Sequence, residues 1–250
     1  MLSLAPYRSA DLVVTLLSRM FGRLAALVHE GKRIGKKSSF PYHQGDCLEI
    51  EFQIRERNEF VKIHSVQAAK RIDPATLPYD RFLFHCYFLE VVRLISRPKT
   101  PEEELTDVTR FYLEQSWRQQ TKYSLMAAIL WRIIGIGGYR FHFNACSTCR
   151  RETLRVDKEN TVAVRKQSYQ LNLDAGEVVC STCLPSPEDA LLTSAMLKAL
   201  WLMDAPPSTE MVTSAIPDSV TKPLIRLLNQ YMLHCLEIRP KSSAMFLSSI

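Results

Sequence analysis

Residues 47–54 read CLEIEFQI, and apolar and polar side chains alternate strictly along this stretch. Successive side chains of a β-strand point to opposite faces, so this alternation predicts a strand with one buried face. The apolar side chains share one face and the polar side chains share the other: Leu48, Ile50, Phe52 and Ile54 against Glu49, Glu51 and Gln53.

The flanking stretches extend this β pattern. Residues 60–68 follow a charged turn that contains Asn58, which predicts a hairpin with 47–54. Upstream, residues 11–17 and 22–28 are β-branched or aliphatic runs separated by a short break. So few strands protect their edges best by curling on themselves, which favours a small antiparallel barrel. We therefore expect a β-barrel domain over residues 1–78.

Helical patterns replace the strands after residue 80, so the fold class is predicted to be α+β. Residues 82–95 are apolar nearly all round and predict a buried helix, and glycines end a further helix predicted at 123–135. Residues 100–103, TPEE, resemble a capping box with proline at the first helical position, and 186–189, SPED, resemble another helix start. A spaced apolar stripe predicts the last helix of an all-α domain over 79–250: Leu224, Leu227, Leu228, Tyr231, Cys235 and Ile238.

Two cysteine pairs of identical spacing interrupt the helical part. Cys146 and Cys149 enclose Ser-Thr, as do Cys180 and Cys183, and residues 150–179 lie between the pairs. The two-residue spacing lets both sulfur atoms of a pair turn toward one ion, so two pairs can fill a tetrahedron. The intervening segment is longer than is usual, and a hairpin within residues 161–173 is expected to absorb the excess. The pattern predicts a zinc-binding insertion at about residues 141–186.

Paired redox cysteines, or buried thiols that adjoin by chance, are the alternatives to zinc. Four thiolates would leave zinc no open coordination position, so the ion is expected to be structural. The remaining cysteines fall within apolar patterns and are interpreted as small core residues: Cys47, Cys86 and Cys235.

A basic segment joins two of the predicted strands. Residues 31–39 read GKRIGKKSS, and four cations beside two hydroxyl groups suit the phosphate oxygens of DNA. The candidate DNA-binding residues are Lys32, Arg33, Lys36 and Lys37, with Arg19 and Arg23 expected near the same surface. A solvated loop whose cations bind nothing is the alternative.

The overall composition is that of a globular protein. The chain has 250 residues, 46% hydrophobic and 23% charged, with a formal net charge of +6. This charge is compatible with a polyanionic partner without identifying one. No apolar run reaches the roughly 18 residues of a membrane span, and the first residues do not resemble a signal peptide. We therefore expect a cytoplasmic protein, no membrane partner, and cysteines that are thiols or metal ligands.

Enzyme motifs are missing from the sequence. None of the six histidines is followed two residues later by Glu, as a zinc deaminase requires. The sequence also lacks the phosphate-binding Gly-x4-Gly-Lys-Ser/Thr motif, so no ATP hydrolysis is expected. The prediction is a protein that binds without catalysis.

The order of these features resembles the bacterial RecO recombination mediators over nearly the whole chain. The resemblance lies in YRSADLVVTLL at residues 7–17, FGRL at 21–24 and GKR at 31–33 with Lys37 and Ser38 downstream. It continues through IGGY at 136–139, the two cysteine pairs, and RPKS at 239–242.

This resemblance implies an N-terminal OB-fold, a helical C-terminal domain and a zinc module inserted into that domain. It also implies a DNA repair and recombination protein that binds single- and double-stranded DNA and anneals complementary strands. The implied partners are RecR and the acidic tail of the single-strand-binding protein, and the implied outcome is the loading of RecA. The implied location is the bacterial nucleoid.

Three positions depart from the family pattern. Arg150 follows Cys149 where the family often has glycine, Glu237 stands where a Leu-Gly step is common, and Ser243 replaces a common arginine. A protein-interaction scaffold that binds only acidic protein tails remains the alternative function, and a zinc hydrolase would need an open metal position.

Overall fold

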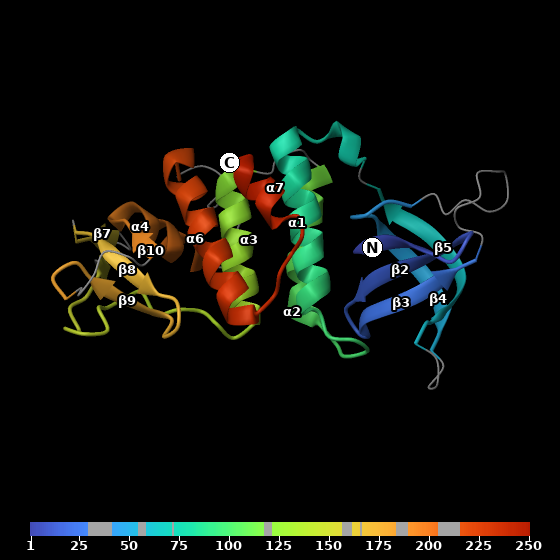
Figure 1. Ribbon diagram of the computed structural model, residues 1–250, viewed down its shortest axis with the longest axis horizontal. Helices are drawn as coiled ribbons and strands as arrows, with labels where there is room; N and C mark the ends of the chain where they lie inside the picture. Colours follow the sequence, from blue (N-terminus) through green and yellow to red (C-terminus); the bar gives the residue numbers. More distant parts are fainter. Residues whose placement is uncertain are drawn as a thin grey trace. The chain divides into compact units, whose positions relative to one another are not determined.

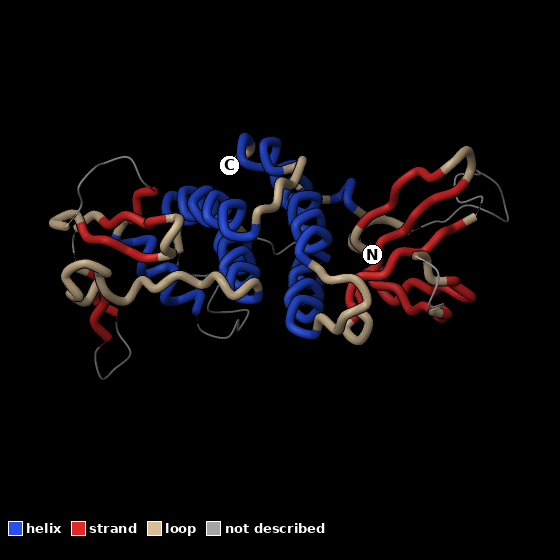
Figure 2. The backbone as a smooth tube through the Cα atoms, turned by 60° about the horizontal axis from the view of Figure 1, so that its bottom comes forward, coloured by secondary structure: helices blue, strands red, loops and turns tan. Residues whose placement is uncertain are grey.

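A computed structural model of the protein describes residues 1–29, 42–54, 59–71, 73–117, 122–156, 162–165, 167–183, 190–204 and 216–250. The chain forms two compact units: unit 1 is Met1–Thr121 with Pro240–Ile250, and unit 2 is Lys122–Arg239. Strands come first in the sequence and helices dominate after them, so the predicted α+β class is confirmed (Figures 1 and 2). The predicted domains, 1–78 and 79–250, divide the chain differently and remain a prediction.

Unit 1 begins with two antiparallel sheets. The first has the order β1-β2-β3 and the second pairs β4 with β5. The bounds are Ser3–Tyr7 (β1), Asp11–Ser18 (β2), Gly22–Val28 (β3), Cys47–Gln53 (β4) and Lys62–Lys70 (β5). Four of these strands were predicted within two residues of their observed ends, whereas β1 was missed.

Two backbone connections join the sheets of unit 1. The N–H of Val61, just before β5, donates to the carbonyl of Ala25 on β3 at 2.8 Å. Gly45, just before β4, donates its N–H to the carbonyl of Met1 at 3.0 Å. Among the described residues these strands still make two sheets and not one closed sheet, so the predicted barrel remains a prediction.

The inner faces of these strands form one hydrophobic core. Alternate residues of β2 and β3 are buried, as the period of two demands. The residues buried in this core are Met1, Val14, Leu16, Leu24, Ala26 and Val61, and Leu48, Ile50 and Phe52 of β4 pack against them.

The turn between β2 and β3 depends on a glycine. Gly22 has φ +58, and a Cβ atom at this position would lie 1.9 Å from the carbonyl oxygen of Thr100. A side chain would therefore clash with the backbone that links α1 to α2, and only glycine fits.

Helices complete unit 1: α1 (Tyr79–Ile95), α2 (Glu103–Trp117), the short α7 (Ser243–Ser248) and a 3-10 turn at Pro74–Thr76. The ring of Phe84 on α1 contacts those of Tyr112 on α2 and Phe246 on α7, at centroid distances of 5.5 and 5.1 Å. All three rings are buried, so aromatic packing holds the three helices together.

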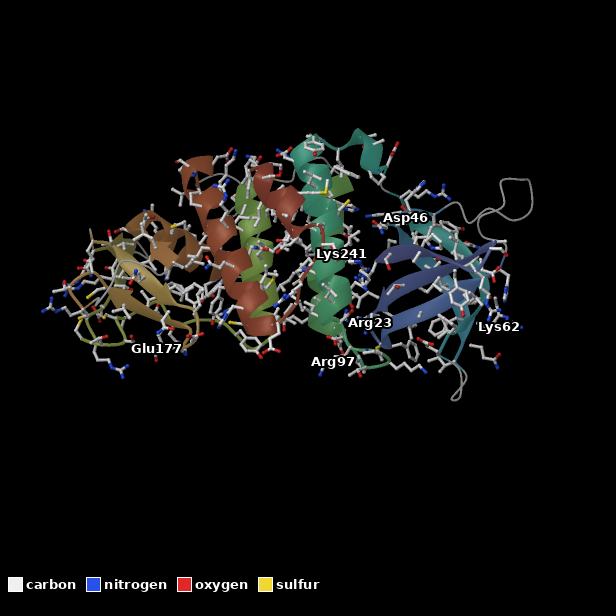
Figure 3. The ribbon with its side chains drawn as sticks, viewed as in Figure 1. Arg23, Asp46, Lys62, Arg97, Glu177 and Lys241 are labelled. Atoms are coloured by element: carbon white, nitrogen blue, oxygen red, sulfur yellow. The ribbon has the colours of Figure 1, made fainter. Side chains whose placement is uncertain are left out.

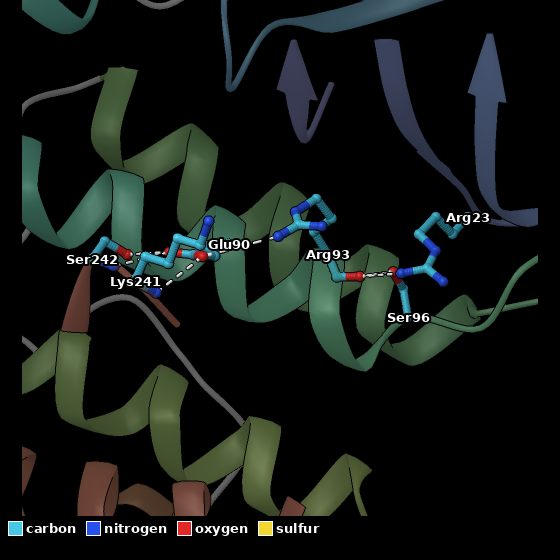
Figure 4. Close-up of polar contacts among 6 residues, drawn as sticks. All are labelled: Arg23, Glu90, Arg93, Ser96, Lys241 and Ser242. Carbon is cyan, nitrogen blue, oxygen red and sulfur yellow. Dashed lines mark hydrogen bonds and ion pairs between the residues drawn. The ribbon is translucent and has the colours of Figure 1, made fainter. Parts of the chain in front are cut away.

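The last described segment is attached to α1 through one carboxylate. Glu90 accepts hydrogen bonds from the backbone N–H groups of Lys241 and Ser242, at 3.0 Å each, and from the hydroxyl of Ser242 at 2.6 Å (Figure 4). Burial raises the pKa of Glu90, but these donors and Arg93 outweigh it, and the net pKa lies below the ordinary value. The carboxylate therefore stays charged and fixes the start of α7.

The capping box predicted at residues 100–103 is wrong. The helix begins at Glu103, the hydroxyl of Thr100 donates to the carbonyl of Pro98 at 3.2 Å, and the Glu103 carboxylate pairs with Arg19 at 3.0 Å. Glu102 instead accepts from the N–H and the guanidinium of Arg97, at 3.1 and 2.8 Å. The box required the Glu103 carboxylate, which instead pairs with Arg19 from the β2–β3 turn.

Unit 2 is built around α3 (Tyr123–Ile136), which is buried nearly all round and packs against α4 (Ser194–Asp204) and α6 (Asp218–Leu236). Its strands are β6 (Leu154–Val156), β7 (Val162–Val164), β8 (Tyr169–Asn172), β9 (Glu177–Cys180) and β10 (Ala190–Leu192). The helices predicted at 123–135 and along 224–238 are confirmed. None of the helices in the described part of the chain could cross a membrane.

Two sequence predictions fail in unit 2. The hairpin predicted within residues 161–173 is wrong, because β7 pairs back to β6 whereas β8 pairs with β9 and β10. The start predicted at 186–189 lies outside the described residues, and the residues after it form β10 before α4 begins at Ser194. That segment therefore does not open the helix.

We expect the stability of unit 1 to depend on the neutral form of His85. Its Nε2 lies 3.3 Å from the carbonyl of Gln44, and its Nδ1 lies 3.4 Å from the hydroxyl of Tyr112. Burial lowers the pKa of His85 to about 4. As pH falls from about 6.5 towards 4, the unfolded chain gains a proton that the folded chain excludes, and stability falls by up to about 3 kcal/mol.

Chemical denaturation across this pH range measures the effect. His85→Gln should flatten the pH dependence, whereas His64→Gln, at an exposed position on β5, should leave it unchanged. Equal slopes for the His85 variant and the original chain would contradict the assignment.

Glu237 provides a second stability prediction. It follows α6, is exposed, and has φ +52, the left-handed conformation that favours glycine. Replacing it by glycine should stabilise unit 2 by about 1 kcal/mol, because the strained Cβ atom is removed. Thermal unfolding of Glu237→Gly and Glu237→Ala separates strain from loss of the carboxylate: the alanine variant keeps the Cβ atom and should gain nothing.

Candidate metal centre and nucleic-acid face

The four paired cysteines meet in unit 2. Cys146 and Cys149 lie between α3 and β6, Cys180 ends β9, and Cys183 lies in the turn that follows. Their Sγ atoms all lie within 4.8 Å of one another, and Cys146 and Cys180 are buried. The two pairs that the sequence predicted to share an ion are therefore brought together, and no other such group is found in the described ranges.

Backbone hydrogen bonds hold the two cysteine turns against each other. The N–H of Arg150 donates to the carbonyl of Cys146, and the N–H of Cys183 donates to that of Cys180, both at 2.9 Å. The N–H of Ser147 donates to the carbonyl of Val178 on β9, also at 2.9 Å. The first turn therefore closes between residues four apart and the second between residues three apart, and the Ser147–Val178 hydrogen bond holds the first turn against β9.

Arg150 adopts a left-handed conformation with φ +59. This is the position where the family pattern often has glycine, and the conformation explains that preference. Arg150 therefore adopts the turn conformation that glycine would adopt, and its Cβ atom is strained as a result.

The pKa values of two of the thiols are shifted in opposite directions. Burial raises the pKa of the Cys146 thiol, but backbone N–H donors outweigh burial and lower it to about 6. At Cys183, hydrogen bonds with the sulfur atoms of Cys180 and Cys149 raise the pKa to about 12. One thiolate therefore forms readily, whereas four adjacent thiolates require a cation among them.

Zinc fits this donor set. Four sulfur ligands at about 2.3 Å from a central ion form a tetrahedron whose edge is about 3.8 Å. The Cys149 and Cys180 Sγ atoms are 3.8 Å apart. A tetrahedron of four protein ligands has no position left for a substrate, so the cluster is suited to a structural ion and not to a catalytic one.

Side chains of α6 anchor the hairpin that provides Cys180. The Nε2 atom of His234 lies 2.9 Å from the Asp174 carboxylate in the β8–β9 turn. A Cβ atom on Gly176, which has φ +61 in the same turn, would lie 2.6 Å from the hydroxyl of Tyr231. These close contacts connect the cysteine cluster to the helical core of unit 2.

The candidate DNA-binding residues have different surroundings. Arg19 is about half exposed and pairs with Glu103 and Asp107 at 3.0 and 3.4 Å. The Glu103 hydrogen bond raises the pKa of Arg19 above its ordinary value, so it stays charged. Arg23 donates to the carbonyl of Arg93 at the end of α1, at 2.6 Å (Figure 4). Lys32, Arg33, Lys36 and Lys37 lie outside the described residues.

One ion pair lies at the end of β3 in unit 1. His29 follows β3, and its Nδ1 atom lies 3.4 Å from the carboxylate of Asp11. Asp11 pairs in register with Tyr7, the last residue of β1. Sequence reasoning missed Tyr7 because β1 is short and contains Pro6, which is not typical of a strand interior.

Comparison with known proteins gives three matches. The family model described as "Recombination protein O C terminal" matches residues 76–244. The chain is 23% identical over 181 residues to "DNA repair protein RecO" of Syntrophus aciditrophicus, covering 72% of this chain and 66% of that relative, just under two thirds. It is also 23% identical over 223 residues to "DNA repair protein RecO" of Nocardioides sp., covering 82% and 83%.

We expect the purified protein to contain one zinc ion that depends on the four cysteines. Cys149→Ser should lose most of the metal and lower the unfolding temperature, because three thiolates hold the ion less tightly. Elemental analysis of the protein measures this, with Cys235→Ser as the matched control outside the cluster. Full zinc content in the Cys149 variant, or loss in both variants, would contradict the assignment.

Proposed function

This chain belongs to the RecO family of recombination proteins, and from that premise we propose that it acts in DNA repair and recombination by binding DNA, without catalysing a reaction. The family match over residues 76–244 is the observation that carries the proposal. The four-cysteine cluster supports the non-enzymatic part, because a closed tetrahedron holds an ion without activating water.

The strands of unit 1 are proposed to be an OB-fold. An OB-fold is a five-stranded, partly open barrel that binds nucleic acid on one face and its loops. The parallel bridge between Ala26 and Val61 supports the proposal on one side of the barrel. The hydrogen bonds of Met1 with Gly45 and Asp46, at 3.0 and 2.6 Å, support it on the other side.

DNA phosphates are proposed to bind the basic segment at residues 31–39. Lys32, Arg33, Lys36 and Lys37 would supply the charge, and Arg19 and Arg23 would add to it at their own positions. Arg19 already pairs with two carboxylates and Arg23 with a carbonyl, so phosphates would compete with these partners. The four cations of the segment are therefore assigned the larger share of the affinity.

The wider role is proposed from family membership. The protein would bind single- and double-stranded DNA and anneal complementary strands by screening their charges. It would contact the acidic tail of the single-strand-binding protein and act with RecR to help RecA replace that protein on DNA. These events take place at the nucleoid, in the cytoplasm.

Replacing Lys32, Arg33, Lys36 and Lys37 by alanine should weaken DNA binding and its salt dependence. If about five phosphates are neutralised, the log–log salt slope on single strands is near −3.5, and each lost contact reduces it by about 0.7. Fluorescence anisotropy with labelled single-stranded DNA, titrated with salt, measures both.

The matched control removes two cations from unit 2, Lys198→Ala with Arg226→Ala, and should leave the slope unchanged. An unchanged slope in the loop variant would remove the segment from the mechanism. If the original chain binds an acidic peptide that ends in phenylalanine but shows no salt-sensitive DNA binding, the scaffold alternative holds and the proposed function is wrong.

A further inference from the structure

The outer face of the β1–β2–β3 sheet is unusually apolar along its middle. Leu12, Val14 and Leu16 point into the core, so Val13 and Thr15 point outward. The register places Val13 between Ala5 on β1 and Leu27 on β3, and Thr15 beside Ala25. An antiparallel sheet usually turns polar residues outward, so this row is atypical of a simple solvent face.

Two aromatic rings meet at one end of this face. Tyr7 is the last residue of β1 on the outward row, and Phe60 lies one residue before Val61, whose side chain points into the core. The ring centroids of Tyr7 and Phe60 are 5.9 Å apart with an interplanar angle of 64°. Both residues are partly exposed.

One cation lies over the Tyr7 ring, and another follows Phe60 closely in the sequence. The guanidinium carbon of Arg8 lies 5.3 Å from the centre of the Tyr7 ring. Lys62, two residues after Phe60, is exposed and points away from the strands (Figure 3). His29, whose Nδ1 atom lies 3.4 Å from the carboxylate of Asp11, is near Tyr7, because Asp11 is the register partner of Tyr7.

We propose that Tyr7 and Phe60 form a stacking platform for unpaired bases, and that this face therefore selects single-stranded over double-stranded DNA. The inference rests on the proposed function and specifies its site. Bases would lie against the rings and the apolar row, while the phosphates face the cations at the rim. In a duplex the bases stack on one another and cannot reach the rings, so the platform contributes nothing to duplex binding.

Replacing each ring by leucine tests the platform. Tyr7→Leu and Phe60→Leu keep an apolar side chain but remove the π face, so single-strand affinity should fall on the order of tenfold for each ring. Affinity for a duplex of equal length should stay within about twofold. The salt slope should not change, because neither substitution removes a phosphate contact.

A spectroscopic readout separates stacking from packing. Single-stranded DNA that contains 2-aminopurine should lose fluorescence on binding, because the base stacks on a ring. This quenching should be retained in Tyr7→Phe, which keeps the ring, and should be reduced in Tyr7→Leu. Phe21→Leu is the matched control, since Phe21 is 42% exposed on the β2–β3 turn and contacts Phe52, away from the pair.

The outcomes separate the two proposals. Leucine variants that bind single strands as tightly as the original chain, or that lose single-strand and duplex binding equally, would overturn the platform while DNA binding stands. Absence of DNA binding by the original chain would overturn the proposed function, and the platform with it.

Discussion

The alternation of side chains along β2 and β3 is the constraint on which unit 1 depends. Residues 12, 14 and 16 fill the core, so residues 13 and 15 must point outward. A shift of the register by one residue would exchange the two rows and expose the core. The same hydrogen-bonding pattern therefore sets both the stability of the sheet and the chemistry of the face that we assign to bases. Val13 and Leu27 point outward because the residues next to them along each strand point into the core.

In unit 2 the corresponding constraint is the separation of four sulfur atoms. The Sγ atoms of the two cysteine pairs lie within 4.8 Å of one another. The Ser147–Val178 hydrogen bond and the contact of His234 on α6 with Asp174 support this arrangement. Backbone N–H donors, among them that of Cys180 at 3.4 Å, accommodate negative charge on the Cys146 sulfur, and a divalent cation would balance the charge of the other thiolates. The cluster thus belongs to the packing of unit 2, because the hairpin that carries Cys180 also carries the Asp174 and Gly176 contacts to α6.

Local pattern was sufficient for some features and insufficient for others. Strict alternation predicted β4, and the charged turn after it predicted its hairpin partner β5. β-branched or aliphatic runs predicted β2 and β3, continuous apolar runs predicted α1 and α3, and spacing alone predicted the four cysteines that meet. The capping box failed because Arg19, 84 residues from Glu103, takes its carboxylate. The hairpin within 161–173 failed because pairing partners lie on both sides of that segment.

Nothing in the sequence pattern places Tyr7 beside Phe60, since their contact depends on how the two sheets join. The left-handed conformations of Arg150 and Glu237 explain two of the family's glycine positions after the fact.

The return of residues 240–250 to unit 1 has a consequence for biosynthesis. Phe246 belongs to the same aromatic cluster as Phe84 and Tyr87, and the Glu90 carboxylate accepts a hydrogen bond from Ser242. Unit 1 is therefore discontinuous in the chain, and a ribosome completes all of unit 2 before it supplies the last helix of unit 1. Although domains usually fold in order of their synthesis, the first unit to emerge here is the last to be finished. Until translation reaches α7, the rings of Phe84 and Tyr87 lack their contacts with Phe246.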